Sequence, residues 1–143
     1  MKADEKTAKE IITILESYSQ AYAHKDLKGL MKLVAPDNDL IFIGTGEDEW
    51  VKGPLELEKG FKRDLTQTDS ITVGFEDIRV SAADNVAWTA TWMTMKAIID
   101  SAEVVLKGRF SAVFEKRDNN WLIVHLHFSL PASEQETGES FPV

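Results

Sequence analysis

Two histidines and a serine alternate along an apolar segment near the C-terminus, where His125, His127 and Ser129 are separated by single residues. Side chains two positions apart in a strand lie on the same face, so these three would share a face with Trp121 and Ile123. Such a pair of histidines can act as acid and base, contact a ligand or hold a metal ion. We predict that this mixed face lines a pocket, with His127 and His125 as candidate catalytic residues and Ser129 as a ligand contact. The structural alternatives are that the histidines hydrogen-bond within a polar part of the core, or that the apolar face is the one that meets the helices.

Metal chemistry has few possible ligands in this chain. It contains no cysteine and three histidines, the third of which, His24, falls in an expected surface turn. The absence of cysteine excludes disulfides, thiolate catalysis, cysteine zinc sites and iron–sulfur clusters. We therefore expect no metal site and no cofactor.

Tyr18 and Tyr22 are four residues apart on an apolar stripe near the N-terminus. A buried tyrosine hydroxyl needs a hydrogen-bond partner, so either one could point into a cavity. Tyr22 is therefore a candidate acid–base partner of His127, and Tyr18 is a candidate ligand contact. The alternative is that both are ordinary core aromatics.

Five further residues are candidate ligand contacts: Glu49, Trp50, Trp88, Trp92 and Arg109. Glu49 and Trp50 follow an acidic turn, so they lie either at a pocket rim or in solvent. Trp88 and Trp92 share a strand face and form either a pocket wall or an interface. An inward Arg109 would offer two parallel N–H donors to a carboxylate ligand, whereas an outward one would be solvated.

The apolar spacing predicts three helices that come before any long strand. Three- and four-residue steps predict a long helix over residues 8–22. A second, shorter helix is expected over residues 27–34, with the Asp26 carboxylate as its N-cap. A third helix begins with Pro54 at its first position and carries apolar residues at four-residue steps as far as Leu65.

After residue 70 the apolar period shortens toward two, which is typical of strands. Three or four strands are expected, at 71–80, 86–99, 103–117 and 121–130. Their connections are short and rich in Asp, Asn and Ser, so consecutive strands should pair antiparallel. A short strand over 40–43 and a brief one at 50–51 precede them.

Helices followed by an antiparallel meander predict an α+β fold, in which N-terminal helices pack on a curved sheet and enclose a cavity. The 143 residues suit a single domain over 1–131, followed by a flexible acidic tail over 132–143. The net charge of −8 argues against nucleic acids and anionic membranes as partners. No apolar run reaches the roughly 20 residues of a membrane span, so cytoplasmic residence is expected.

Two stretches resemble the SnoaL-like families of the nuclear transport factor 2-like (cystatin-like) superfamily. One is Ile43-Gly44-Thr45-Gly46 with Glu49-Trp50 and Gly53, and the other is the segment 121–129. The second also resembles the end of the association domain of calcium/calmodulin-dependent protein kinase II, with its Trp-x-x-Val-His-x-His pattern. This resemblance implies a hydrophobic cone with a pocket and a homodimer or ring formed through the outer face of the sheet.

The resemblance does not imply one activity, because this fold hosts several. Steroid isomerases of this fold use a carboxylate base near the end of the first strand, together with a neutral Asp and a Tyr as oxyanion donors. The expected first strand here reads Ile41-Phe42-Ile43 and the long strand over 86–99 also lacks an acid. The Asp–Arg–Asp arrangement of epoxide hydrolases of this fold is not visible either.

Three hypotheses follow. The first is a dimeric domain that binds a small organic molecule in its pocket without chemistry. The second is a metal-independent isomerase, hydrolase or dehydratase that uses His127 as its acid–base group. The third is a protein-assembly module that associates through its sheet.

Overall fold

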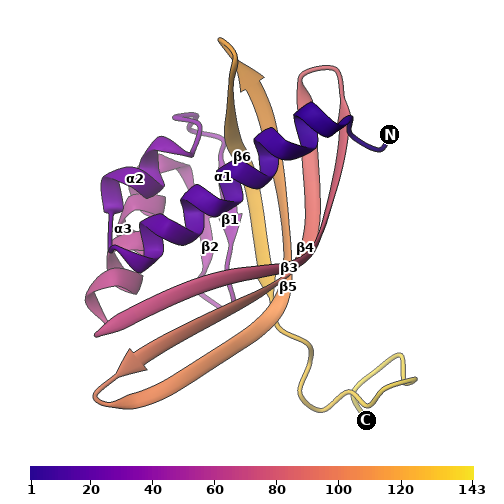
Figure 1. Cartoon of the computed structure of the whole chain (residues 1–143). Helices are drawn as coiled ribbons and strands as arrows, with labels where there is room; N and C mark the ends of the chain where they lie inside the picture. The colour runs from indigo at the N-terminus through magenta and orange to yellow at the C-terminus, as the bar shows by residue number, and fades with distance from the viewer.

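The computed structural model describes all 143 residues and shows helices packed on one curved, open sheet (Figure 1). The helices are α1 (Glu5–Ala23), α2 (Leu27–Lys32) and α3 (Gly53–Thr66). The strands are β1 (Ile41–Ile43), β2 (Trp50–Lys52), β3 (Ser70–Ala83), β4 (Val86–Ile99), β5 (Ala102–Arg117) and β6 (Asn120–Ser129). Their order across the sheet is β2-β1-β6-β5-β4-β3, and every pair is antiparallel except β1 with β6. The predicted α+β class and element order are confirmed.

The helices begin where the sequence supplies caps. Asp4 accepts a 2.7 Å hydrogen bond from the Thr7 amide at the start of α1, and Asp26 accepts one of 2.9 Å from Gly29 in α2. Pro54 lies in the first turn of α3. Helix α2 ends two residues before the predicted limit, because Val34 instead forms a bridge to β6. No helix of the chain is long and apolar enough to cross a membrane.

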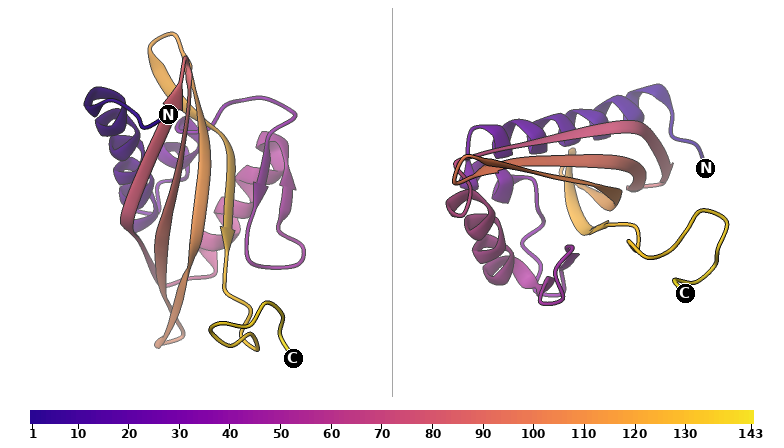
Figure 2. Two further views of the ribbon diagram at one scale, coloured as in Figure 1. Left: turned by 90° about the vertical axis from the view of Figure 1, so that its right-hand side faces the viewer. Right: turned by 90° about the horizontal axis from the view of Figure 1, so that it is seen from below.

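Tight turns produce the meander. Asp100 and Ser101 both have positive φ, as do Asp118 and Asn119. Two consecutive residues of this kind make the two-residue hairpin loops whose twist matches that of paired strands. The long strands β3, β4 and β5 bend together, and α1 runs along them (Figure 2). The chain after Ser129 forms no further helix or strand and extends away from the helices (Figure 1).

One side of the sheet, here called the concave face, packs against the helices and forms the core. Residues of β4 alternate between this face and the opposite, outer face, with Ala87, Thr89 and Met93 buried and Trp92 exposed. The largest fully buried side chains come from both layers: Ile11, Leu15, Tyr22, Leu30, Met93, Phe110, Phe114 and Ile123.

A bulge in β6 overturns the predicted face of the histidines. Phe114 pairs with Ile123 and Val113 pairs with His125, so Val124 is an extra residue without an opposing partner. The extra residue reverses the alternation along the strand. Ile123 is therefore buried on the concave face, but His127 lies on the outer face and is exposed. The prediction that one unbroken face carries all the alternate residues from 121 to 129 is wrong.

Candidate functional site

A cavity of about 200 Å³ lies between α1, α3, the β1–β2 segment and the concave face of the sheet. Its volume is below the roughly 300–1,000 Å³ of sites for drug-sized ligands, which limits an occupant to a compact molecule. Most of the wall is apolar, and its large apolar members come from α3, β1 and the concave face of the sheet: Phe42, Leu57, Phe61, Met93, Leu126 and Phe128.

A hydrogen bond between the two helices lies in the cavity wall. The Tyr22 hydroxyl on α1 donates to Asp64 Oδ2 on α3 over 2.8 Å. Tyr22 is only 2% exposed, and burial raises the pKa of its hydroxyl well above the usual value. Tyr22 therefore serves as a hydrogen-bond donor and remains neutral at ordinary pH.

Asp64 is a desolvated carboxyl group in the cavity lining. Burial raises its pKa above the usual value, and the negative charge of Glu49 adds to this shift. The hydrogen bond from Tyr22 and the positive charge of Arg63 act in the opposite direction. No ion pair reaches the carboxylate, and its Oδ1 atom has no hydrogen-bond partner. The group thus retains an unused acceptor beside the cavity.

Tyr18 supplies a second polar atom with a free acceptor position. Its ring packs 5.1 Å from that of Tyr22, measured between centroids, and only 4% of the residue is exposed. Burial raises the pKa of its hydroxyl, and the neighbouring Tyr22 hydroxyl offsets part of that rise. The Tyr22 hydroxyl is the hydrogen-bond partner of the Tyr18 hydroxyl. A hydroxyl oxygen has two lone pairs, so the Tyr18 oxygen keeps an acceptor position free in the wall of the cavity that Tyr18 lines.

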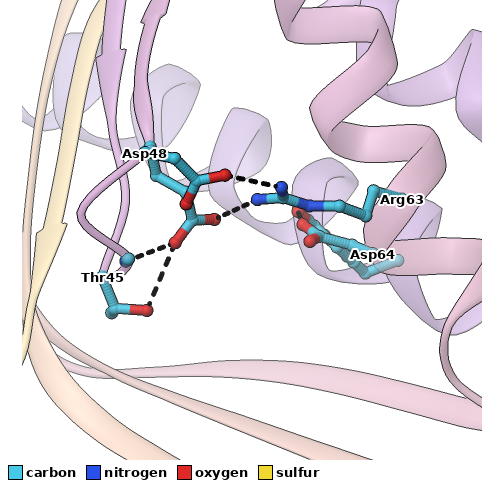
Figure 3. A network of polar contacts seen from close by, with 7 residues as sticks. Thr45, Asp48, Arg63 and Asp64 are labelled. Carbon is cyan, nitrogen blue, oxygen red and sulfur yellow. Dashed lines mark hydrogen bonds and ion pairs between the residues drawn. The ribbon is translucent and has the colours of Figure 1, made fainter.

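A network of charged contacts joins the β1–β2 turn to α3 beside the cavity (Figure 3). Arg63 pairs with Asp48 over 3.0 Å and with Glu49 Oε1 over 3.4 Å. The other Glu49 oxygen accepts hydrogen bonds from the Gly46 amide and the Thr45 hydroxyl. Arg63 offers no free anion-binding site, because its guanidinium is already shared between two carboxylates.

Three of the residues singled out from the sequence meet in this cavity, namely Tyr18, Tyr22 and Glu49. They come from the first helix and from the turn between the two short strands. Trp50, next to Glu49, is 57% exposed and does not line the cavity. The side chain at the next position, Val51, does so instead, as expected from strand alternation.

The other six candidates lie on the outer face of the sheet and not in the cavity: Trp88, Trp92, Arg109, His125, His127 and Ser129. Strand pairing places Trp92, Arg109 and Ser129 side by side in one row across β4, β5 and β6. The His125 ring donates through Nδ1 to the Ile41 carbonyl over 2.8 Å, which is the ordinary structural role considered above. No group of three or more His, Asp or Glu side chains is placed to hold a metal ion.

Sequence reasoning missed Asp64. It lies three residues after Phe61 and seven after Leu57, both of which face the core from α3. That spacing places a carboxylate at the border of the buried stripe, and this signal could have identified it. The pairing of Asp64 with Tyr22 could not be identified from local spacing, because 42 residues separate the two.

The family model described as a SnoaL-like domain matches residues 11–133. No curated protein matches the chain. Among solved structures, a nuclear transport factor 2-like superfamily protein from Salmonella enterica is 20% identical with a TM-score of 0.84, covering 97% of this chain and 100% of that one.

Two further solved structures share the fold. A putative dehydratase of the same superfamily from Streptomyces avermitilis is 14% identical with a TM-score of 0.82, covering 90% of this chain and 99% of that one. A putative calcium/calmodulin-dependent protein kinase II association domain from Xanthomonas campestris is 23% identical with a TM-score of 0.78, covering 92% and 95%. At these identities the similarity establishes the architecture only.

Proposed function

The chain belongs to the SnoaL-like domain family, and we propose that it binds a small organic molecule in the cavity between α1, α3 and the sheet, and does so as a homodimer. The observation that carries this proposal is the pairing of an apolar wall with two oxygen atoms that keep a free acceptor position, Asp64 Oδ1 and the Tyr18 hydroxyl oxygen. Binding sites typically combine an apolar enclosure with a few such groups that orient the ligand.

The energetics of Asp64 support the same proposal. A carboxyl group that loses hydration without an ion-pair partner destabilises the folded state. An apolar residue at this position would fill the space at lower cost, so the carboxyl group is better explained by a ligand than by folding. Tyr22 compensates only in part, because it satisfies one of the two oxygen atoms.

Gly60 offers a direct test of ligand binding. It lines the cavity from α3, and a Cβ added there would meet no atom within 4 Å. We would screen a panel of single-ring amines, alcohols and carboxylic acids by ligand-observed NMR. Gly60→Leu should abolish binding by filling the space, whereas Lys59→Leu, at the neighbouring exposed position, should not. Binding that survives in Gly60→Leu would show that the ligand lies elsewhere.

The outer face of the sheet supports the homodimer. No helix covers this face, and Trp92 and Val105 are 41% and 49% exposed on it. Glu76 and Arg109 flank Trp92 in the same row of paired residues. A two-fold axis near Trp92 would bring Arg109 of each copy toward Glu76 of the other, which makes the surface self-complementary. Sedimentation velocity should show a dimer, and a monomer at the highest soluble concentration would refute this part.

A proton-transfer enzyme is the second candidate, favoured by the raised pKa of Asp64 beside a neutral tyrosine. The earlier candidate, His127, is exposed outside the cavity, so Asp64 with Tyr22 would take its role. The test is exchange of carbon-bound hydrogen in D₂O, followed by NMR on panel compounds that bind. Exchange that Asp64→Asn abolishes while binding persists would favour the enzyme, and no exchange above buffer would favour simple binding.

A further inference from the structure

The ionisable groups around the cavity are unequal in charge. Its lining contains two carboxyl groups, Glu49 and Asp64, and one cation, Arg63. Asp48 does not line the cavity but adds a third carboxylate beside it, where it pairs with Arg63. Three acids against one base leave the site negative by two charges when all are ionised. An anionic ligand would therefore be repelled, and the carboxylate ligand considered for Arg109 has no binding partner here because Arg109 lies outside the cavity.

The two free acceptor positions, on Asp64 Oδ1 and the Tyr18 oxygen, suit a hydrogen-bond donor of the ligand. When the carboxyl group of Asp64 is ionised, its Oδ1 atom accepts hydrogen bonds and cannot donate. The Tyr18 hydroxyl can accept as well as donate. Glu49 has no comparable spare capacity, since both of its oxygen atoms already have protein partners. A ligand group with two or more N–H donors would satisfy both atoms.

Aromatic rings surround these acceptors. The Phe61 ring lies 6.0 Å from that of Tyr22 and 6.3 Å from those of Tyr18 and Phe42, measured between centroids. The faces of aromatic rings carry negative charge density and attract cations, and the attraction grows when water is excluded. The aromatic rings thus favour the same ligand charge as the carboxyl groups do.

From this arrangement we propose that the cavity takes a compact organic amine, about one ring in size, whose ammonium group binds Asp64 and the Tyr18 hydroxyl while its apolar part packs on the aromatic wall. This inference rests on the ligand-binding function proposed above and names its chemical class. The free acceptors, the negative charge balance and the ring cluster all favour a cation.

The proposal implies that binding depends on pH. The charged or titratable groups around Asp64 are Glu49 from the β1–β2 turn, Arg63 on its own helix, and Tyr18 and Tyr22 from α1. Lys25 binds the carbonyl of Thr68 instead. A cation prefers ionised Asp64, so amine affinity should fall as pH drops through the raised pKa of this group. A neutral ligand should show no such change.

Three matched probes test the class: benzylamine, benzyl alcohol and benzoate, titrated into the full chain by calorimetry at pH 7.5. We expect benzylamine to bind at least tenfold more tightly than benzyl alcohol, and benzoate not to bind. Asp64→Asn should reduce benzylamine affinity at least tenfold and change benzyl alcohol affinity less than threefold. Glu58→Gln, which neutralises an exposed acid of the same helix, should change neither.

The possible failures are distinguishable. If benzyl alcohol or benzoate binds as tightly as benzylamine, and Gly60→Leu abolishes that binding, the amine class is wrong but the ligand cavity stands. If no probe binds, or if binding survives in Gly60→Leu, both proposals fail. Should Asp64→Asn not fold by circular dichroism, Tyr18→Phe gives the same test, because it removes the second acceptor and should weaken benzylamine but not benzyl alcohol.

Discussion

Tyr22 and Asp64, separated by 42 residues in the chain, are joined by a 2.8 Å hydrogen bond that connects α1 to α3 across the cavity wall. The bond places a buried hydroxyl against a desolvated carboxyl group. It therefore couples the packing of two helices to the ionisation of the candidate site.

Tyr22→Phe should lower the stability of the fold. The substitution removes a hydrogen bond to a charged acceptor and leaves the Asp64 carboxylate without its one hydrogen-bond partner, at a cost of about 1–3 kcal/mol. The loss in free energy of unfolding, measured in urea at pH 7, should shrink near pH 3, where Asp64 is protonated. Tyr18→Phe serves as the control and should cost less, since the partner of the Tyr18 hydroxyl is the neutral Tyr22 hydroxyl, whereas Tyr22 donates to a carboxyl group. Equal losses from both variants would show that the Tyr22–Asp64 bond contributes nothing.

The change in free energy of unfolding caused by Asp64→Asn should be more favourable at neutral pH than in acid. The pKa of Asp64 is raised in the folded state, so between its unfolded and folded values the folded protein binds more protons. The contribution of this group to stability therefore declines as pH rises through that window. An asparagine side chain does not titrate, so its contribution to stability does not change with pH in this window. Urea titrations of both proteins from pH 3 to pH 8 should show the variant gaining on the wild type as pH rises, and parallel curves would contradict the raised pKa.

Gly108→Ala should be strongly destabilising. An added Cβ would lie 2.2 Å from the Ser129 carbonyl oxygen and 2.8 Å from the Phe128 ring, so strands β5 and β6 would have to separate locally. Overpacking of this kind costs about 1–3 kcal/mol. Gly74→Ala is the matched control, because a Cβ there meets nothing within 4 Å, and it should be close to neutral. Thermal unfolding that shifts equally in the two variants would contradict the close approach.

Trp92→Glu should convert the proposed dimer to a monomer without unfolding it. The substitution replaces a 41% exposed apolar side chain at the centre of the outer face with a charge. Two copies related by a two-fold axis would then bring like charges together. Sedimentation velocity measures the outcome, with circular dichroism as a check on folding. Trp50→Glu, at another exposed tryptophan, should leave association unchanged.

Local features of the sequence were enough to predict most of the secondary structure. Asp26 and Pro54 start helices because capping and the fixed proline geometry depend on neighbours within one turn. The turns at 100–101 and 118–119 likewise follow from residues that tolerate positive φ. The apolar stripe of α1 also placed Tyr18 and Tyr22 toward the interior, where the structure has them.

The tertiary structure decided which polar residues meet in the cavity. The prediction for His127 failed at a single extra residue, Val124, whose bulge exists only because β6 pairs with β5 in that register. Asp64 became the central acid because α3 folds back onto α1 and brings it to Tyr22. Amphipathic periodicity alone tells which side of an element is buried. The group that a buried polar atom will meet depends on how distant elements pack, and that information is not local to any segment of the chain.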